Sequence, residues 1–341
     1  MSTLTVTPYT NGNSSADAIN TATWSTLIGS AGNTSNTITT NTTSSYFSIS
    51  TIGAVTWYSG IRGIFIFDTS ALGSSAIISA ATLTFTTDGG GSTGGGLSPA
   101  PQGNVYLASP ASNSVISNAD WNNVSTTAMS NSPISFDSWQ PTAAFAFNST
   151  GLANISKTGY SRFGAREVNY DVTGTSPATR VAFYCAVAYG GAGAPSLVIT
   201  YTLPTAPTVT GSAATNVAQT SMTGNGNITA DGGATVTTRG FCYMTGTSGD
   251  PTTANSTAFD TGSFATGAYT KSITGLTADT NYRVRAYAIN SVGTSYGTTT
   301  QEKTLANGPT TLSTWGGIAK ASIKTMDGVA IASVKTWNGV T

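Results

Sequence analysis

Short apolar runs with a two-residue period recur along the chain, and turn-forming residues separate them. The clearest run is GIRGIFIFDTSAL at residues 60–72, which alternates and then ends in a turn signal. The run SLVITYT at 196–202 closes a series of such segments just before Pro204. Alternation over about four to eight residues is typical of a β-strand, and no segment shows sustained helical periodicity. The sequence therefore predicts an all-β fold of short strands.

The 341 residues divide into three predicted parts. Residues 1–203 hold many short strands spaced by turn signals, which predicts a jelly-roll-like β-sandwich. Residues 204–305 follow a Pro-punctuated linker and predict a second β-sandwich. Residues 306–341, after ANGP, predict a short C-terminal β-hairpin tail.

Charged residues make up 8% of the chain, against about 25% in an average globular domain. The formal net charge is zero, and the Arg residues are scattered singly. Binding to nucleic acid needs clustered Lys and Arg, so the composition argues against nucleic acid as a main partner. Ser, Thr, Asn and Gly replace the charged residues, which is typical of an all-β surface or particle protein.

The chain contains no His. This removes Ser-His-Asp and Cys-His catalysis, His-ligated zinc and the usual general base. Only carboxylate pairs, Tyr or Lys remain for chemistry, so we expect no enzyme activity, no cofactor and no metal. The two cysteines, Cys185 and Cys242, sit in apolar strand-like runs, which favours buried free thiols over a disulfide between domains.

The N-terminal MSTLTVTPYT has neither the basic nor the apolar region of a signal peptide, and no run approaches about 18 apolar residues. These features predict no membrane insertion. A surface-type composition without an export signal suggests a virus particle that is assembled in the host cytoplasm and released by lysis. A chain from which an export signal was removed would have the same features, and it would be extracellular or on the cell surface.

Three ordered blocks of the first part carry a family resemblance: RGIFIFDTSALGSSAIISAATLTF, FNSTGLANISKTGYSRFGAREVNYD and SLVITY. They resemble the DNRLRE-type domain, a jelly-roll module of bacterial surface proteins and phage structural proteins. The resemblance covers most of residues 55–202. It implies an extracellular structural or binding role and no catalytic residues.

The second part contains LTADTNY, which places Leu276 six residues before Tyr282. This spacing predicts a tyrosine corner, in which the hydroxyl bonds back to the preceding backbone. The runs GNIT-x-DGG, RGFCY and GLTADTNYRVRAYAINSVG resemble bacterial fibronectin type III-like repeats over nearly the whole part. The resemblance implies an Ig-like sandwich that acts as a spacer or makes weak carbohydrate or protein contacts.

The tail repeats itself every eleven residues: WGGIAKASIKT, MDGVAIASVKT and WNGVT. Asp327-Gly328 and Asn338-Gly339 are two-residue hairpin signals. A turn at Asp327-Gly328 predicts one long ribbon in which Met326 faces Val329 and Ile318 faces Trp337. Its small apolar face has no core of its own, and a lone hairpin is marginal in water.

The tail therefore predicts a docking or oligomerisation element, with packing on the chain's own second domain as the alternative. The pattern also resembles NGVAIASIK-type repeats at the ends of phage tail and other virion proteins. The residues expected to make the assembly contacts are Trp315, Ile318, Ile323, Met326, Val329, Ile331, Val334 and Trp337.

Other candidate sites have plainer interpretations. Asp68 before Thr and Ser is typical of a turn cap, with a cation or sugar site as the alternative. If AREVNYD forms one strand, Glu167 and Asp171 lie about 13 Å apart along it, which is too far for the carboxylate pair of a glycosidase. Ion pairing with Arg162 or Arg166 is favoured. The loop 89–96 predicts a flexible hairpin tip, and core packing is favoured over sugar stacking for Trp57, Tyr58, Trp121 and Trp139.

These observations lead to one expected function: a non-enzymatic virion structural protein, of the decoration, fibre or tail-associated kind, for display, attachment or assembly. The expected partners are other virion proteins or copies of the chain itself. Copies of the chain would form a homo-oligomer, and a trimer is one candidate state. Host-surface carbohydrate is a further candidate partner. The alternatives are a bacterial surface adhesin or extracellular filament subunit, and a polysaccharide-degrading enzyme.

Overall fold

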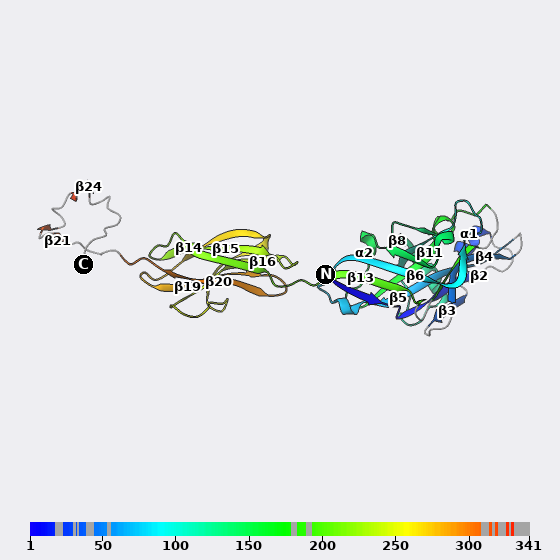
Figure 1. Ribbon diagram of the computed structural model, residues 1–341, viewed down its shortest axis with the longest axis horizontal. Helices are drawn as coiled ribbons and strands as arrows, with labels where there is room; N and C mark the ends of the chain where they lie inside the picture. Colours follow the sequence, from blue (N-terminus) through cyan, green and yellow to red (C-terminus); the bar gives the residue numbers. More distant parts are fainter. Residues whose placement is uncertain are drawn as a thin grey trace. The chain divides into compact units, whose positions relative to one another are not determined.

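The computed structural model describes residues 1–17, 23–29, 32, 34–38, 44–52, 56–178, 183–188 and 193–307, and the tail positions 314–315, 318–319, 325–326 and 329–330. The chain divides into two compact units, Met1–Leu203 and Pro204–Thr341. Figure 1 shows strands as the main elements of both units, and the predicted all-β class is confirmed.

The first unit is built from antiparallel strands. They are β1 (Ser2–Val6), β2 (Thr10–Asp17), β3 (Thr34–Ile38), β4 (Ser44–Ile52), β5 (Thr56–Asp68), β6 (Ile77–Thr93), β7 (Gln102–Ala108), β8 (Val124–Ala128), β9 (Ile134–Ser135), β10 (Thr142–Ala146), β11 (Tyr160–Glu167), β12 (Phe183–Ala188) and β13 (Ser196–Thr202). The helical segments are short: α1 (Trp24–Gly29), α2 (Ser149–Ala153), the 3₁₀ turns η1 (Ser70–Leu72), η2 (Asn118–Asn123) and η3 (Phe136–Ser138), and the π-helical turn η4 (Val168–Val172).

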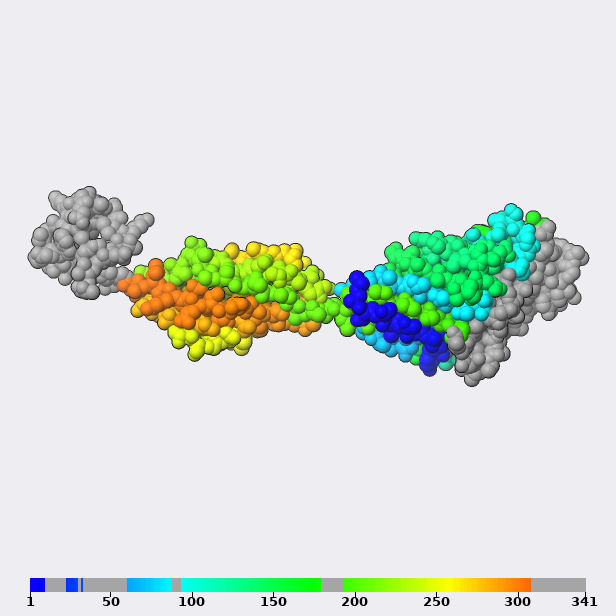
Figure 2. All heavy atoms as spheres, in the orientation of Figure 1, coloured from blue at the N-terminus to red at the C-terminus, as the bar shows by residue number. Residues whose placement is uncertain are grey.

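The long strand β6 belongs to both layers of a jelly-roll-like sandwich. Its first part pairs with β13 and β10, and its last part pairs with β12, where Tyr184 lies opposite Thr93. The strand order is β1-β13-β6-β12-β4-β5-β11-β7-β8, and β1 is the exposed strand seen in dark blue in Figure 2. The predicted hairpin tip at 89–96 is therefore partly wrong, because β6 extends through the glycine run to Thr93.

Both faces of β5 are buried. Phe65 and Phe67 point into the core between the layers, where aromatic rings from several strands meet. Ile64 and Ile66 point the other way, into a smaller cluster that includes Ile116. Because successive side chains of a strand face opposite sides, this burial requires a covering segment on each side. The second cover comes from Ile116 and Val124, on either side of η2, and from η4.

The second unit has strands β14 (Thr208–Thr215), β15 (Ser221–Ala230), β16 (Val236–Thr245), β17 (Ser256–Phe264), β18 (Gly267–Thr274), β19 (Asn281–Ile289) and β20 (Thr294–Lys303). They form two sheets, β14-β15-β18 and β17-β16-β19-β20, the arrangement of a fibronectin type III or Ig-like sandwich. The predicted tyrosine corner is confirmed, because Tyr282 Oη accepts the backbone N–H of Thr277 at 2.9 Å.

Two inward-facing positions of β15 are glycines where large apolar residues are the rule. A Cβ on Gly224 would lie 2.7 Å from Cγ of Phe241, and one on Gly226 would lie 2.5 Å from Cζ of Tyr269. The rings of Phe241 and Tyr269 lie tilted to one another, with centroids 5.5 Å apart, and fill the space over this strand. The glycines thus leave room for one ring from each sheet, Phe241 of β16 and Tyr269 of β18.

We expect Gly224→Val to destabilise the second unit by about 1–3 kcal/mol, because the added side chain forces Phe241 out of its position. Scanning calorimetry of the full chain would show the lower transition temperature. Asn227→Ala, which alters the same strand at a position facing outward, is the matched control. An unchanged transition in Gly224→Val would contradict the packing described for β15.

Candidate functional site

Two short antiparallel pairs place four of the predicted tail residues. Trp315 pairs with Ile318 in β21 (Thr314–Trp315) and β22 (Ile318–Ala319), and Met326 pairs with Val329 in β23 (Thr325–Met326) and β24 (Val329–Ala330). Met326 opposite Val329 is the predicted pairing. Ile318 pairs with Trp315, and its predicted ribbon partner Trp337 lies outside the described residues, so the long ribbon stays a prediction. The other predicted contact residues, Ile323, Ile331, Val334 and Trp337, lie outside the described residues.

The two pairs have the same spacing. Two residues separate the partners in each pair, Gly316-Gly317 in the first and Asp327-Gly328 in the second, and both are two-residue hairpin sequences. Side chains alternate along a continuous strand, so a repeat of eleven, an odd number, would turn equivalent residues to opposite faces. A turn inside each repeat removes that conflict.

A buried ionic cluster in the first unit accounts for the predicted carboxylate pair. Asp171 accepts two hydrogen bonds from Arg62, at 3.0 and 2.6 Å, and two from Arg166, both at 2.9 Å. Arg62 also donates to the carbonyl of Trp121 at 2.6 Å and stacks over its ring at 3.8 Å. All three charged side chains are less than a tenth exposed. The favoured ion pairing is confirmed for Arg166, whereas Arg162 bonds Asn113.

Glu167 holds the turn that carries Asp171. Its carboxylate accepts the backbone N–H groups of Gln102, Asn169, Tyr170 and Asp171 at 2.6–3.1 Å. The assumption of one continuous strand was therefore wrong, because β11 ends at Glu167 and η4 follows. Burial raises the pKa of Glu167 above its ordinary value, and the hydrogen bonds from the four N–H groups offset only part of that increase. Both carboxylates are engaged in structure, and neither faces an open site.

Most of the plainer interpretations are confirmed. Asp68 caps the turn before η1 by accepting the N–H and hydroxyl of Ser70, at 3.0 and 2.6 Å. Trp121 and Trp139 are core residues, 1% and 0% exposed, so neither stacks on a sugar. Cys242 is a buried free thiol, and burial raises its pKa to about 11. The side chains of Trp57, Tyr58 and Cys185 lie outside the described residues.

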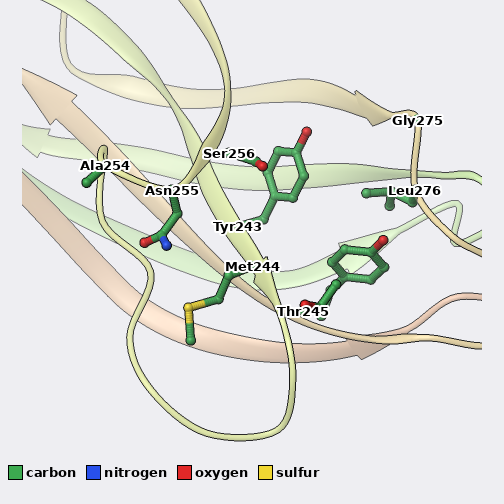
Figure 3. Close-up of a pocket in the computed structure, with 9 residues that line it drawn as sticks. Tyr243, Met244, Thr245, Ala254, Asn255, Ser256, Gly275 and Leu276 are labelled. Carbon is green, nitrogen blue, oxygen red and sulfur yellow. The ribbon is translucent and has the colours of Figure 1, made fainter.

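An open groove lies at one end of the second unit, where β16 ends, β17 begins and the β18–β19 connection passes (Figure 3). Its volume is about 620 Å³. The lining residues are Tyr243, Met244, Thr245, Ala254, Asn255, Ser256, Gly275, Leu276 and Tyr282. No sequence motif indicated this groove, since its residues come from four separate segments. The tyrosine corner was the one local signal near it.

The rings of Tyr243 and Tyr282 form the apolar part of the groove. Their centroids lie 6.3 Å apart in an edge-on arrangement, and Tyr243 packs partly on the core of the unit. Hydroxyls of Tyr243, Thr245 and Ser256 and the amide of Asn255 form the polar part. No lining residue is charged. Such a surface suits binding of a neutral polar molecule more than acid–base chemistry.

Comparisons with known proteins show distant structural similarity alone. No family model matches the chain, and no curated protein matches it. The sensor domain of the anti-sigma factor RsgI4 from Pseudobacteroides cellulosolvens is similar over 30% of this chain and 98% of its own, with 15% identity and a TM-score of 0.24. Domains A168–A170 of titin are similar over 36% of this chain and 46% of their own, with 18% identity and a TM-score of 0.22.

No helix among the described residues combines the length and the apolar character that a transmembrane helix requires.

We expect Asp171→Asn to destabilise the first unit by about 3–5 kcal/mol, because it leaves two buried guanidinium groups without a counter-charge. Four of the six Trp residues lie in this unit, two lie in the tail and residues 204–305 contain none, so urea unfolding followed by tryptophan fluorescence reports the first unit against a tail background that all variants share. The control is Asp68→Asn in the same unit, which changes an exposed carboxylate that caps a turn and should leave the unfolding midpoint nearly unchanged. Equal losses in the two variants would contradict the account.

The cluster also predicts a pH dependence. Burial opposes ionisation of Asp171, but Arg62 and Arg166 outweigh it and hold its pKa below the ordinary value. This stabilisation is complete above the unfolded pKa of about 3.9 and is lost as the pH falls through the lower folded pKa. Between pH 6 and 3 the unfolding midpoint should fall more steeply in the wild type than in Asp171→Asn. Parallel curves would contradict the assignment, since both proteins keep Glu167.

Proposed function

We propose that the chain is a non-enzymatic structural protein of a bacteriophage-like particle, of the decoration, fibre or tail-associated kind. Its two β-sandwich units serve display and attachment, and its tail joins it to other virion proteins or to copies of itself. The observation that carries the proposal is the repeated register of the tail. Trp315 with Ile318 and Met326 with Val329 are the same pairing, eleven residues apart.

The tail pairs are too small to be stable alone. Each described ladder contains two residue pairs, and even a longer isolated hairpin is marginal in water. A chain that repeats such an element presents the same backbone pairing at regular intervals. Stability then has to come from contacts outside the hairpin, and copies of the chain or a neighbouring particle protein supply them in this proposal.

The state of the carboxylates supports a structural role for the first unit. Asp171 is enclosed by two arginines, and Glu167 is enclosed by backbone N–H groups. Asp120 accepts the N–H of Ser117 at 2.7 Å and that of Ala111 at 3.0 Å. These groups hold turns in place, and each of them is already saturated by protein donors.

Deletion of 306–341 tests the proposal. We expect the truncated protein to lose its oligomeric mass in light scattering and its incorporation into particles, because the tail makes the assembly contacts. Both calorimetric transitions of residues 1–305 should remain, since the described core residues of both units lie within that range. The matched control is a variant whose tail has the same length and composition but a scrambled sequence.

A tail deletion that leaves both mass and incorporation unchanged overturns the docking role. Gly317→Val together with Gly328→Val is a finer variant, because it alters only the two-residue connections and should also abolish assembly. Recovery of the intact chain from a bacterial surface, with none in particles, would replace the proposal by the adhesin or filament alternative.

A further inference from the structure

We propose that the groove lined by Tyr243 and Ser256 binds a neutral saccharide. The inference extends the display role proposed above by naming what a displayed unit would contact, and it does not depend on the tail. It rests on four properties of the groove: its position, its free polar groups, its fixed aromatic rings and its lack of charge.

The groove lies mainly on β-strands. Tyr243 and Thr245 come from β16, Ser256 begins β17, and Tyr282 lies in β19 next to the β18–β19 connection. A volume of about 620 Å³ falls within the range of roughly 300–1,000 Å³ found for small-molecule sites. Groups held by strands keep their spacing better than groups on loops, which lowers the cost of ordering on binding.

The free polar groups match the chemistry of sugar hydroxyls. In the second unit as described, Tyr243 Oη, Thr245 Oγ1 and Ser256 Oγ make no hydrogen bond within the protein. Asn255 uses its Oδ1 to accept the N–H of Thr252 at 2.9 Å, which leaves its Nδ2 available. A hydroxyl both donates and accepts, and an amide nitrogen donates twice. These groups can therefore donate hydrogen bonds to ligand hydroxyls and also accept hydrogen bonds from them.

The aromatic rings supply an apolar surface of fixed orientation. Tyr282 is 5% exposed, and the N–H of Thr277 holds its hydroxyl. Tyr243 is packed against it and against the core, while part of its surface remains accessible in the groove. A pyranose presents C–H groups on its faces and hydroxyls around its edge. A tyrosine with a fixed ring and a free hydroxyl is complementary to both.

The absence of charge selects among ligands. Recognition of carboxylate, sulfate or phosphate groups relies on Arg, Lys or converging N–H donors. None of the nine lining residues is charged. An anionic sugar would lose hydration at its charged group without a compensating partner, so the groove favours neutral sugars.

The test uses the full chain, labelled with nitrogen-15, and follows amide signals by NMR during titration. The neutral probes are maltotriose, cellotriose and chitotriose, and the anionic probe is 3′-sialyllactose. We expect at least one neutral probe to shift the amide signals of Met244, Asn255 and Gly275 in a saturable way. The sialylated probe should leave them unchanged. The variant that lacks 306–341 should give the same shifts, which separates this result from the assembly role.

Three variants make the assignment specific. Ser256→Arg places a long side chain at an exposed position in the groove and should abolish the shifts. Ser263→Arg makes the same change at an exposed position of β17 outside the groove and should bind as wild type. Tyr243→Phe keeps the ring and removes one hydrogen-bonding group, so affinity should fall roughly threefold to tenfold.

Several outcomes overturn the inference. Absence of saturable shifts with all three neutral probes rules out the neutral saccharide. Shifts that appear with the sialylated probe alone show an anionic ligand instead. Shifts that persist in Ser256→Arg place the binding elsewhere on the chain, and loss in Ser263→Arg shows that the substitution acts through something other than the groove.

Discussion

The buried carboxylate of Asp171 joins the turn η4 to two strands of the first unit. Through Arg62 it reaches β5, and through Arg166 it reaches β11. Arg62 extends the network to η2 by bonding the carbonyl of Trp121 and covering its ring. A buried ion pair contributes little net stability compared with apolar residues, but removal of one partner is costly. The cluster therefore fixes which turn packs on which strand, in a chain that otherwise contains few charges.

Local sequence signals predicted the strands and the corners well. The run SLVITYT corresponds to β13 at both ends, and the hydroxyl of Tyr282 makes the predicted bond. The π-helical turn after β11 could not be predicted in this way. It depends on Glu167 accepting three consecutive N–H groups, and on Asp171 meeting Arg62, which is 109 residues away in the chain. The alternation of residue types in AREVNYD indicates neither the bonds to Glu167 nor the contact between Asp171 and Arg62.

The glycine run shows where local reasoning failed. Glycines at 89–91 indicate a loop, yet pairing with β12 keeps β6 extended to Thr93. Tertiary pairing overrode a weak propensity there. In the tail, Gly316-Gly317 is a hairpin sequence, and the residues on either side of it, Trp315 and Ile318, pair. The groove lay beyond sequence reasoning, since four distant segments form it.

The connection within each tail repeat has a consequence for how such a chain can vary. A continuous ribbon would lose its alternation if one repeat were inserted or removed, because eleven is odd. Pairing within one repeat, such as that of Met326 with Val329, is not subject to this constraint. Duplication or loss of a whole block would leave every other block intact. The number of blocks can then change by recombination between similar segments, without any change in the two β-sandwich units.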